Sequence, residues 1–578
     1  MLHTNRGQAV HKTDRKSLQL RLVAIAEDEA TREFIAIIKF RDINGQIRRL
    51  EQPKSSLRKI DQLKEALDNA GAYLSTNDKE NTDAIRALSL SAHNTERWKY
   101  APAVGWYDGH RAFVSADRVI GRPRGDARIL PPRRSTRFKL ARKGSHRDWV
   151  KSVAGPARYS SYMVLGICIA LAAPLLDFLD FHSFGVLLSG PSKAGKSTAL
   201  VAAGSVIGIA REEDLPNFRT TDAALGELPT NFNDLVMLIN ELGLFKGSAK
   251  DRCRRVRDLA YGFAEGRGTT YSKFVSQDDG IGSDRWRSLS FATGEETMDQ
   301  IALAAGETRS MGESIRWIDL RGVRRGAADI FDRCPKSVSA DHRTEWGRQL
   351  CQGLRQAAAD NHGVAFDQYI KQVIKSRHEI TVWLRQLIGE FVDAVIDPVD
   401  EPAVHHLASC LGLIRAAGIL GVRFGTLPYS EKFVDRCIVR CYRAARRGLR
   451  TETELLRSGL RRLRAKLKSS NLPTVARKGQ PRADDFKMAD GYNDKSGPTP
   501  TVTIRAEKFK GWFDDQRQST LVLRWLQSKK ALLCKPTLPA KSGNGIVWAE
   551  SQPEWPDRSR PRSIAIELSH GLLDQLKV

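Results

Sequence analysis

The stretch 190–197 constrains the fold of this chain more than any other. It reads Gly-Pro-Ser-Lys-Ala-Gly-Lys-Ser and fits the phosphate-loop pattern G-x-x-x-x-G-K-[ST] without a mismatch. The apolar run 184–188 before it predicts a short buried strand, and 198–203 after it predicts a helix start. Backbone N–H groups of such a loop and the helix N-terminus together surround phosphate. The sequence therefore predicts a nucleoside triphosphate site.

ATP and Mg²⁺ are the expected cofactors of this loop. The Lys196 ammonium is expected to reach the β- and γ-phosphates, and the Ser197 hydroxyl is expected to hold Mg²⁺. The alternative is a glycine- and serine-containing loop ahead of an ordinary helix. The expected cofactor-binding residues are Gly190, Pro191, Ser192, Lys193, Ala194, Gly195, Lys196, Ser197 and Thr198.

A second buried strand is predicted over 235–239, and Asn240 and Glu241 end it. Phosphate-loop ATPases use one carboxylate near Mg²⁺ and one that orients the attacking water. Glu241 fits the second role. Asn240 stands where an Asp is expected; it can accept a hydrogen bond from Mg²⁺-bound water but brings no charge. Nucleotide binding is expected, whereas turnover stays open, and an ordinary core strand with a polar end is the alternative.

Two further polar residues lie at the ends of predicted strands. Thr293 follows the strand 288–292 and fits the γ-phosphate sensor of AAA+ ATPases, with a plain strand end as the alternative. Arg316 comes just ahead of another strand. It is predicted to reach the γ-phosphate of a neighbouring subunit as an arginine finger, and a structural arginine is the alternative.

The net charge indicates the class of partner. The chain of 578 residues has 93 Lys and Arg against 67 Asp and Glu, a formal charge of +26. Such an excess usually accompanies a polyanion, most often nucleic acid. We expect no membrane span, lipid anchor or secretory signal. The eight cysteines form no C-x-x-C pair, and Cys437 and Cys441 are expected as buried thiols. A cytoplasmic protein is the resulting expectation.

A chain of this length needs several cores. The predicted fold class is α/β, with a AAA+ phosphate-loop NTPase core between further domains. The expected units are an N-terminal α+β domain (1–121), a basic connector (122–148), the AAA+ core (149–326), a helical bundle (327–468), a linker (469–500) and a C-terminal winged-helix-like domain (501–578).

Two basic regions carry open alternatives. The connector 122–148 is either a strap that contacts phosphates or a solvated linker. The C-terminal segment has the order helix, strand, basic loop, strand. Its helix 520–527 would place Arg524 and the nearby Lys529 against DNA, or the domain would serve packing and partner contact instead.

Several motifs resemble one family. They are Ala170 to Leu176, the phosphate loop, Ser205 to Gly208, Asn233-Asp234, Trp286-Arg287, Ala292 to Glu295, Asn361 to Phe366 and Gly105 to Tyr107. In these the chain resembles the helicase-like domain of unknown function 927, found in prophages, plasmids and integrative elements. Some members are similar to the archaeal minichromosome-maintenance helicase.

The resemblance implies a replicative helicase of a mobile element. Lys196 and Ser197 would bind phosphate and Mg²⁺, Glu241 would be catalytic, and Thr293 would be the sensor. Asn240 departs from the family pattern, and the family includes inactivated derivatives. In a ring, the insertion 261–273 would face the pore, where Arg267 and Lys273 would track a DNA backbone; a buried loop is the alternative.

Three functions compete at this point. The first is a AAA+ DNA helicase or translocase, expected as a homo-oligomer in the form of a hexameric ring, that acts on single-stranded, fork or origin DNA with element-encoded replication proteins. The second is a nucleotide-bound, hydrolysis-deficient DNA-binding initiator. The third is a remodeller of protein complexes. The Asn240→Asp variant probes the first against the second, since a large gain in turnover would mark the native site as impaired.

Overall fold

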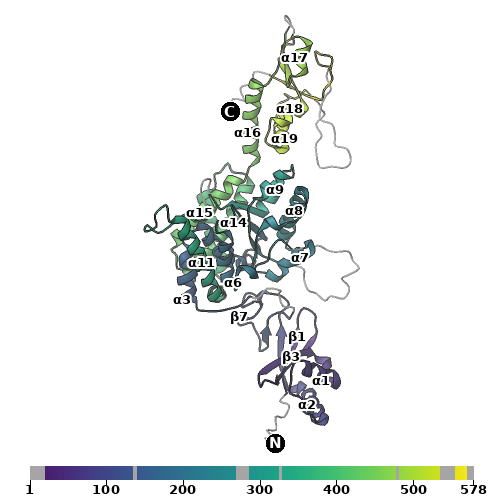
Figure 1. The fold of residues 1–578 in the computed structure, drawn as a ribbon, viewed down its shortest axis with the longest axis vertical. Helices are drawn as coiled ribbons and strands as arrows, with labels where there is room; N and C mark the ends of the chain where they lie inside the picture. The colour runs from purple at the N-terminus through teal and green to yellow at the C-terminus, as the bar shows by residue number, and fades with distance from the viewer. Residues whose placement is uncertain are drawn as a thin grey trace, which may run out of the picture.

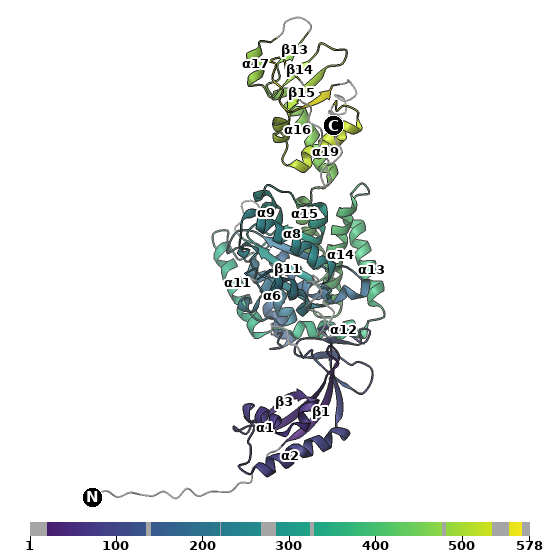
Figure 2. The ribbon, with the colours of Figure 1, turned by 90° about the vertical axis from the view of Figure 1, so that its right-hand side faces the viewer.

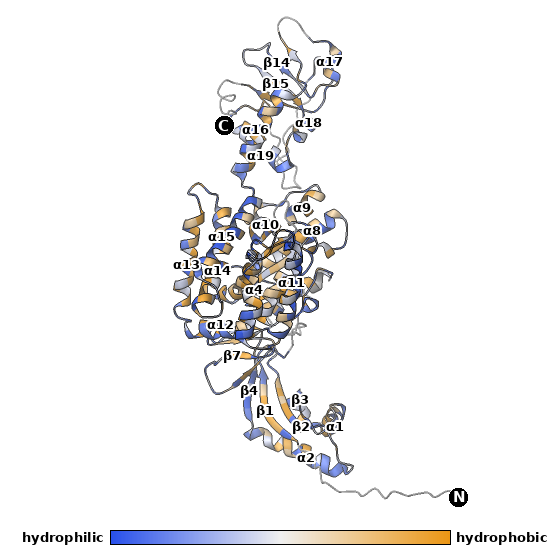
Figure 3. Cartoon of the chain, turned by 60° about the vertical axis from the view of Figure 1, so that its left-hand side comes forward, coloured by the Kyte–Doolittle hydropathy of each residue, from blue (hydrophilic) through white to orange (hydrophobic). Residues whose placement is uncertain are grey.

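The computed structural model describes residues 20–133, 140–219, 221–267, 285–323, 329–476, 481–533 and 554–568, without the side chains of 222–224. These residues form three bodies along one long axis, with the nucleotide-site body in the middle (Figures 1 and 2). The apolar interior divides in the same way, because separate clusters fill the middle body and each end. In Figure 3 the most hydrophobic segments are strands and helices inside these bodies.

The N-terminal body is a five-stranded sheet in the order β3-β2-β1-β4-β8 with two helices. β2 and β3 pair antiparallel as a hairpin, and Gly45 in its turn has a positive φ of 78°. Leu63 and Leu67 on the first helix of this body are buried. Its elements are β1 (Arg21–Asp28), β2 (Phe34–Arg41), β3 (Ile47–Pro53), α1 (Ile60–Asn69), α2 (Asp78–Ser91), β4 (Glu96–Tyr100) and β8 (Arg128–Leu130).

A small sheet connects this body to the middle one. β5 (Gly105–Tyr107) and β6 (Ala112–Val114) pair antiparallel, and β7 (Val119–Gly121) completes the sheet. Phe113 lies in the core cluster of the middle body, and the Trp106 indole donates to the Pro174 carbonyl at 2.6 Å. The small sheet therefore packs with the middle body, although its residues lie within the expected N-terminal domain (1–121).

The described part of the basic connector contacts the chain's own acids. Arg124 pairs with Asp108 at 3.1 Å, and Lys143 pairs with Asp360 at 2.9 Å. Residues 128–130 form β8, which pairs with β4. No helix occurs between 122 and 133 or between 140 and 145.

The middle body is built on a parallel sheet in the order β10-β11-β9-β12. The predicted strands at 184–188, 235–239 and 288–292 are confirmed. The apolar run at 164–176 supplies most of a core helix, α5, and the 3₁₀ turn Ala173–Leu175 that follows it; every residue of α5 is buried. The sheet and its helices are α3 (His146–Trp149), α4 (Gly155–Ala157), α5 (Ser161–Ala172), β9 (Phe184–Ser189), α6 (Lys196–Ile207), α7 (Asp222–Glu227), β10 (Val236–Ile239), α8 (Ala249–Glu265), β11 (Leu289–Gly294), α9 (Met298–Ala304), α10 (Met311–Arg316) and β12 (Trp317–Arg321).

Five helices complete the middle body, as the helical pattern predicts. Cys437 and Cys441 are buried free thiols on the last of them. By length and apolar composition α14 could cross a membrane, but 72% of that stretch is buried, with α5, α13 and α15 packed against it. The helices are α11 (Arg343–Asp360), α12 (Val364–Lys375), α13 (Ile380–Val395), α14 (Pro402–Arg423) and α15 (Glu431–Gly448).

The C-terminal body includes more of the chain than expected. Thr451 forms a capping box with Glu454 at the start of α16, and this helix packs on α19 and shares the C-terminal core, since Leu463 is buried there. The expected linker 469–500 is wrong, because it supplies two strands to the sheet β13-β14-β15-β16. The elements are α16 (Glu452–Ser469), β13 (Thr474–Val475), α17 (Ala483–Lys487), β14 (Gly491–Asp494), β15 (Thr501–Arg505), α18 (Ala506–Gly511), α19 (Gln516–Ser528) and β16 (Ser563–Glu567).

Candidate nucleotide site

The phosphate loop joins β9 to α6 at the carboxyl edge of the parallel sheet. Gly195 begins α6 with a φ of 97°, which a side chain would strain. At Gly190 an added Cβ would lie 3.0 Å from Val323 Cγ2, and the Gly190 N–H donates to the Gly294 carbonyl at 3.1 Å. The glycines therefore fit a backbone that turns tightly at the start of a helix, with the helix N-terminus facing the loop.

Lys196 is a buried cation whose ammonium contacts carbonyl groups. Its Nζ donates to the carbonyls of Gly190 at 2.8 Å and Pro191 at 2.7 Å. Burial lowers the pKa of this ammonium, while the carboxylates of Glu241 and Glu295 act in the opposite direction. Among the described residues, no carboxylate forms an ion pair with Lys196. An anionic phosphate would supply that missing charge.

Asn240 links three groups at the same edge. Its Oδ1 accepts from the Thr293 hydroxyl at 2.7 Å and from the Ser197 hydroxyl at 3.3 Å. Its Nδ2 donates to Glu212 Oε1 at 3.1 Å. The Asn240 amide, at the end of one strand, therefore contacts side chains from the neighbouring strand, from the first turn of α6 and from the turn after α6.

Glu241 has a constrained backbone next to this amide. Its φ of 60° and ψ of 82° are rare for a residue with a side chain, and such strain concentrates at functional sites. The Glu241 N–H donates to Thr293 Oγ1 at 3.2 Å, which fixes the turn. Its carboxylate is partly exposed and accepts from the Gly243 N–H at 3.2 Å. Glu241 can therefore receive a proton from a water at the loop.

The donors present fit a phosphate group and a cation held mainly by phosphate. Mg²⁺ binds oxygen and usually takes only one or two carboxylates from the protein. Ser197 Oγ and Asn240 Oδ1 are the neighbouring oxygens, with Glu241 beside them. No cluster of three His, Cys, Asp or Glu suited to a metal occurs in the described residues.

Sequence reasoning missed Glu212 and Arg355. Glu212 lies in the 3₁₀ turn 212–214 after α6, and Arg355 comes from α11. Arg355 pairs with Glu212 at 2.8 Å and donates from Nε to Thr198 Oγ1 at 3.0 Å. The only sequence signal for Glu212 is the acidic run 212–214, and this run does not indicate that the Glu212 side chain contacts Asn240.

The structure brings some predicted site residues together and separates others. Lys196, Ser197, Asn240, Glu241 and Thr293 share the carboxyl edge. Thr198, in contrast, is buried and faces α11.

The remaining predicted residues lie elsewhere. Arg316 ends α10 at the amino edge of the sheet, donates to the Gly312 carbonyl and lies over Tyr261. Arg267 is exposed beside a cavity of about 810 Å³ at that edge. Lys273 lies outside the described residues. Arg524 and Lys529 are exposed at α19 in the C-terminal body.

The amino edge holds a dense polar network. Asp234 accepts from the Trp106 N–H at 3.0 Å and is nearly fully buried. Burial raises the pKa of Asp234 to about 7, although the Trp106 hydrogen bond opposes this. Arg287 pairs with Asp177, and His110 contacts Asp177 at 2.6 Å, which keeps the pKa of Asp177 below its usual range. This network attaches the small sheet to the core.

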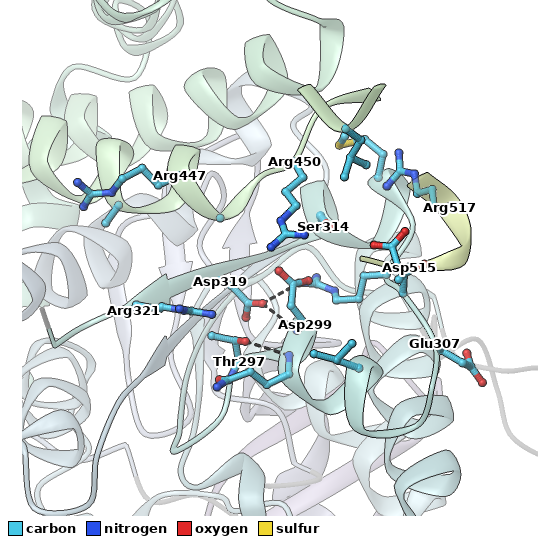
Figure 4. A pocket seen from close by; sticks show the side chains of 18 of the residues that line it. Thr297, Asp299, Glu307, Ser314, Asp319, Arg321, Arg447, Arg450, Asp515 and Arg517 are labelled. Carbon is cyan, nitrogen blue, oxygen red and sulfur yellow. Dashed lines mark hydrogen bonds and ion pairs between the residues drawn. The ribbon is translucent and has the colours of Figure 1, made fainter. Parts of the chain in front are cut away.

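A second cavity of about 680 Å³ lies where the core, the bundle and the C-terminal body meet (Figure 4). Arg309 is buried and pairs with Asp319 at 2.9 Å, while burial raises the pKa of Asp319. Figure 4 shows Arg321 and Arg450 pointing toward the same space. The cavity beside the end of β12 is therefore lined by both arginines and carboxylates, with the arginines in excess.

Comparison with known proteins agrees with the family resemblance. The family model described as "Domain of unknown function (DUF927)" matches residues 5–277. Among solved structures, "SCCmec type IV Cch - active helicase" has a TM-score of 0.62 and 15% identity, over 97% of this chain and 95% of that one. No curated protein matches the chain. The chain thus resembles a helicase-like family of mobile elements, and it shares a fold with that helicase along nearly its whole length.

Proposed function

We propose that this chain, a relative of helicase-like proteins of mobile elements, is an ATP-dependent DNA helicase or translocase. The observation that carries the proposal is the arrangement of side chains at the carboxyl edge of the sheet. There, among the described residues, a buried Lys196 ammonium without a carboxylate partner lies next to Ser197, Thr293 and Glu241 on a helicase-like fold. The assignment of the middle body as a AAA+ core and of the protein as a hexameric ring belongs to this proposal.

The loop residues divide the chemistry among themselves. The backbone N–H groups of 190–195 and the Lys196 ammonium bind and orient the phosphates of ATP. Ser197 and Asn240 hold Mg²⁺, which when bound neutralises charge on the phosphates. Glu241 accepts a proton from the attacking water, and Thr293 holds the backbone of Glu241 in place.

Arg316 is proposed to act on a neighbouring subunit. It lies at the end of a short helix at the amino edge and is held by one carbonyl and the Tyr261 ring, without a carboxylate partner among the described residues. The guanidinium therefore keeps its charge available for a phosphate supplied by another copy.

DNA contact is proposed for the C-terminal body and for the insertion after α8. The order of elements in the C-terminal body supports a winged helix. It runs α16, β15, α18, α19, the bridge at Leu532 and β16, and β13 and β14 extend its sheet. Arg524 and Lys529 are exposed on its last helix. The formal charge of +26 fits a polyanionic partner.

The ATPase rate with and without single-stranded DNA tests this proposal. A motor turns over faster with DNA, and Lys196→Ala abolishes the rate. Lys371→Ala, which removes an exposed lysine from α12, serves as the matched control and leaves the rate unchanged.

A hydrolysis-deficient, DNA-binding initiator is the second candidate, and the neutral Asn240 is the observation that favours it. It predicts ATP and DNA binding with negligible turnover under both conditions. Wild-type protein that binds no ATP would contradict both functions.

A further inference from the structure

Asn240 can present two different faces to the nucleotide site. An amide has an oxygen that accepts and an NH₂ group that donates, and a half turn about its bond exchanges them. Only the oxygen face can interact favourably with Mg²⁺ or with the hydrogens of its bound water. A site with Asn in place of Asp therefore works only if something selects the oxygen face.

Glu212 is the group that makes this selection. A carboxylate only accepts hydrogen bonds, so it requires the NH₂ of Asn240 at the 3.1 Å contact. A flipped amide would set its oxygen against the carboxylate. The hydroxyls of Ser197 and Thr293 on the other side could accept either orientation, because a hydroxyl both donates and accepts.

Contacts from α11 hold the Glu212 carboxylate in place. Arg355 pairs with the second carboxylate oxygen of Glu212 at 2.8 Å. The same Arg355 donates to Thr198 on α6, which anchors the guanidinium next to the loop.

We propose that Glu212 is a positioning residue that locks the Asn240 oxygen toward Ser197 and the Mg²⁺ of a bound nucleotide. This inference rests on the proposed function, because it concerns the same site. It also explains the neutral side chain at 240: an Asp there would place two carboxylates at hydrogen-bond distance, and like charges so close repel. Asn240 and Glu212 thus form one unit in which the charge is at 212 and the metal-facing oxygen is at 240.

The inference reverses the simple expectation for Asn240→Asp. That single variant gains no turnover and loses Mg²⁺ affinity, because its new carboxylate meets the carboxylate of Glu212. The double variant Glu212→Gln/Asn240→Asp restores the contact with donor and acceptor exchanged, since the Gln amide donates to the carboxylate introduced at position 240. The double variant is therefore expected to perform better than either single one.

The test measures binding without turnover. Calorimetry gives the Kd of a non-hydrolysable ATP analogue in EDTA and in excess Mg²⁺, and the ratio of the two reports the metal's contribution. Glu212→Gln is expected to lower this ratio about tenfold, the size of one charge-assisted hydrogen bond. Asn240→Asp also lowers it, and the double variant returns to the wild-type ratio or above.

Glu213→Gln is the matched control, because Glu213 lies in the same turn, is exposed and faces no site residue among the described contacts. It leaves the ratio unchanged, and thermal unfolding verifies that each variant is folded. A wild-type ratio in Glu212→Gln overturns the inference, as does a gain in Asn240→Asp alone or a double variant that stays as low as the single ones. Wild-type protein that binds no nucleotide refutes the proposed function and the inference with it.

Discussion

The two edges of the central sheet use polar residues in opposite ways. At the amino edge, Asp177 and Arg287 neutralise each other, and Asp234 is buried against the Trp106 N–H. At the carboxyl edge, the partners of Lys196 in the described part of the chain are carbonyls, and Glu241 is partly exposed. Groups whose charges are matched inside the chain hold bodies together, whereas groups that lack a matching charge are available to a ligand.

The largest effect is expected at Lys196. Lys196→Met keeps the apolar stem of the side chain and removes the ammonium that compensates phosphate charge. Affinity for ATP with magnesium is expected to fall at least about 100-fold by calorimetry, since a charge-assisted contact to phosphate at a buried site is lost. If Lys196→Met unfolds the protein instead of weakening ATP binding, Lys196 has a structural role like that of the charged residues at the amino edge.

Glu241 is expected to affect rate but not binding. Glu241→Gln keeps the size of the side chain and its contact to Gly243 but removes the base, so turnover with DNA falls about 10²- to 10³-fold. The Kd for ATP changes less than about threefold. Glu213→Gln, at an exposed residue of the turn after α6, is the control and keeps the rate. A large change in Kd for Glu241→Gln would contradict the assigned role.

The amino edge is expected to control stability as a function of pH. The pKa of Asp234 is about 7 in the native state against 3.8 in the unfolded chain, because burial disfavours its charge. Between these values the native state keeps a proton that the unfolded chain has lost. The free energy of unfolding contributed by Asp234 is therefore complete below about pH 4 and falls as the pH rises toward 7, by at most about 4 kcal/mol.

The Asp234→Asn variant removes this dependence, because an amide does not titrate yet still accepts from the Trp106 N–H. Denaturant unfolding of both proteins at pH 5 and pH 7 measures the difference. His110, Asp177 and Arg287 face the same group and remain in both proteins, so they cancel in the comparison. Equal pH slopes for the two proteins would show that Asp234 is already ionised in the native state. Nucleotide affinity should not change at either pH.

The smallest effect is expected outside the core. Arg524→Ala and Lys529→Ala each remove one exposed charge at α19, so each should lower the salt slope of DNA binding by about 1. Arg462 of the same body is paired with Asp514 at 2.6 Å, and Arg462→Ala should leave the slope unchanged. Titration of labelled DNA at several salt concentrations measures these slopes. An equal change of the salt slope in all three variants would mean that an ion pair within the chain does not distinguish structural charges from DNA-binding charges.

Local pattern predicted the strands and the loop of the core. The strand, glycine loop and helix at 184–207 were readable because loop chemistry and apolar runs are adjacent in the chain. The linker at 469–500 was wrong because Pro, Gly and Ser content says nothing about strands formed with a distant partner, here β15.

The same limit applied to the family motifs. The motifs of the family resemblance include Gly105-Trp106, Asn233-Asp234 and Trp286-Arg287. From the sequence alone these motifs had no assigned physical role. The structure brings them together in one network at the amino edge. Each motif is local, whereas their meeting depends on the register of parallel strands.

The sequence by itself determined the phosphate loop, the polar strand ends and the excess of positive charge, because each is encoded by neighbouring residues or by composition. Only the tertiary structure decided that Glu212 and Arg355 reach Asn240, and that Arg316 lies at the opposite edge from Lys196. Parallel strands collect their ends into two separate edges, and helices return distant residues to one of them. Side chains that act together at such an edge have no fixed spacing in the chain.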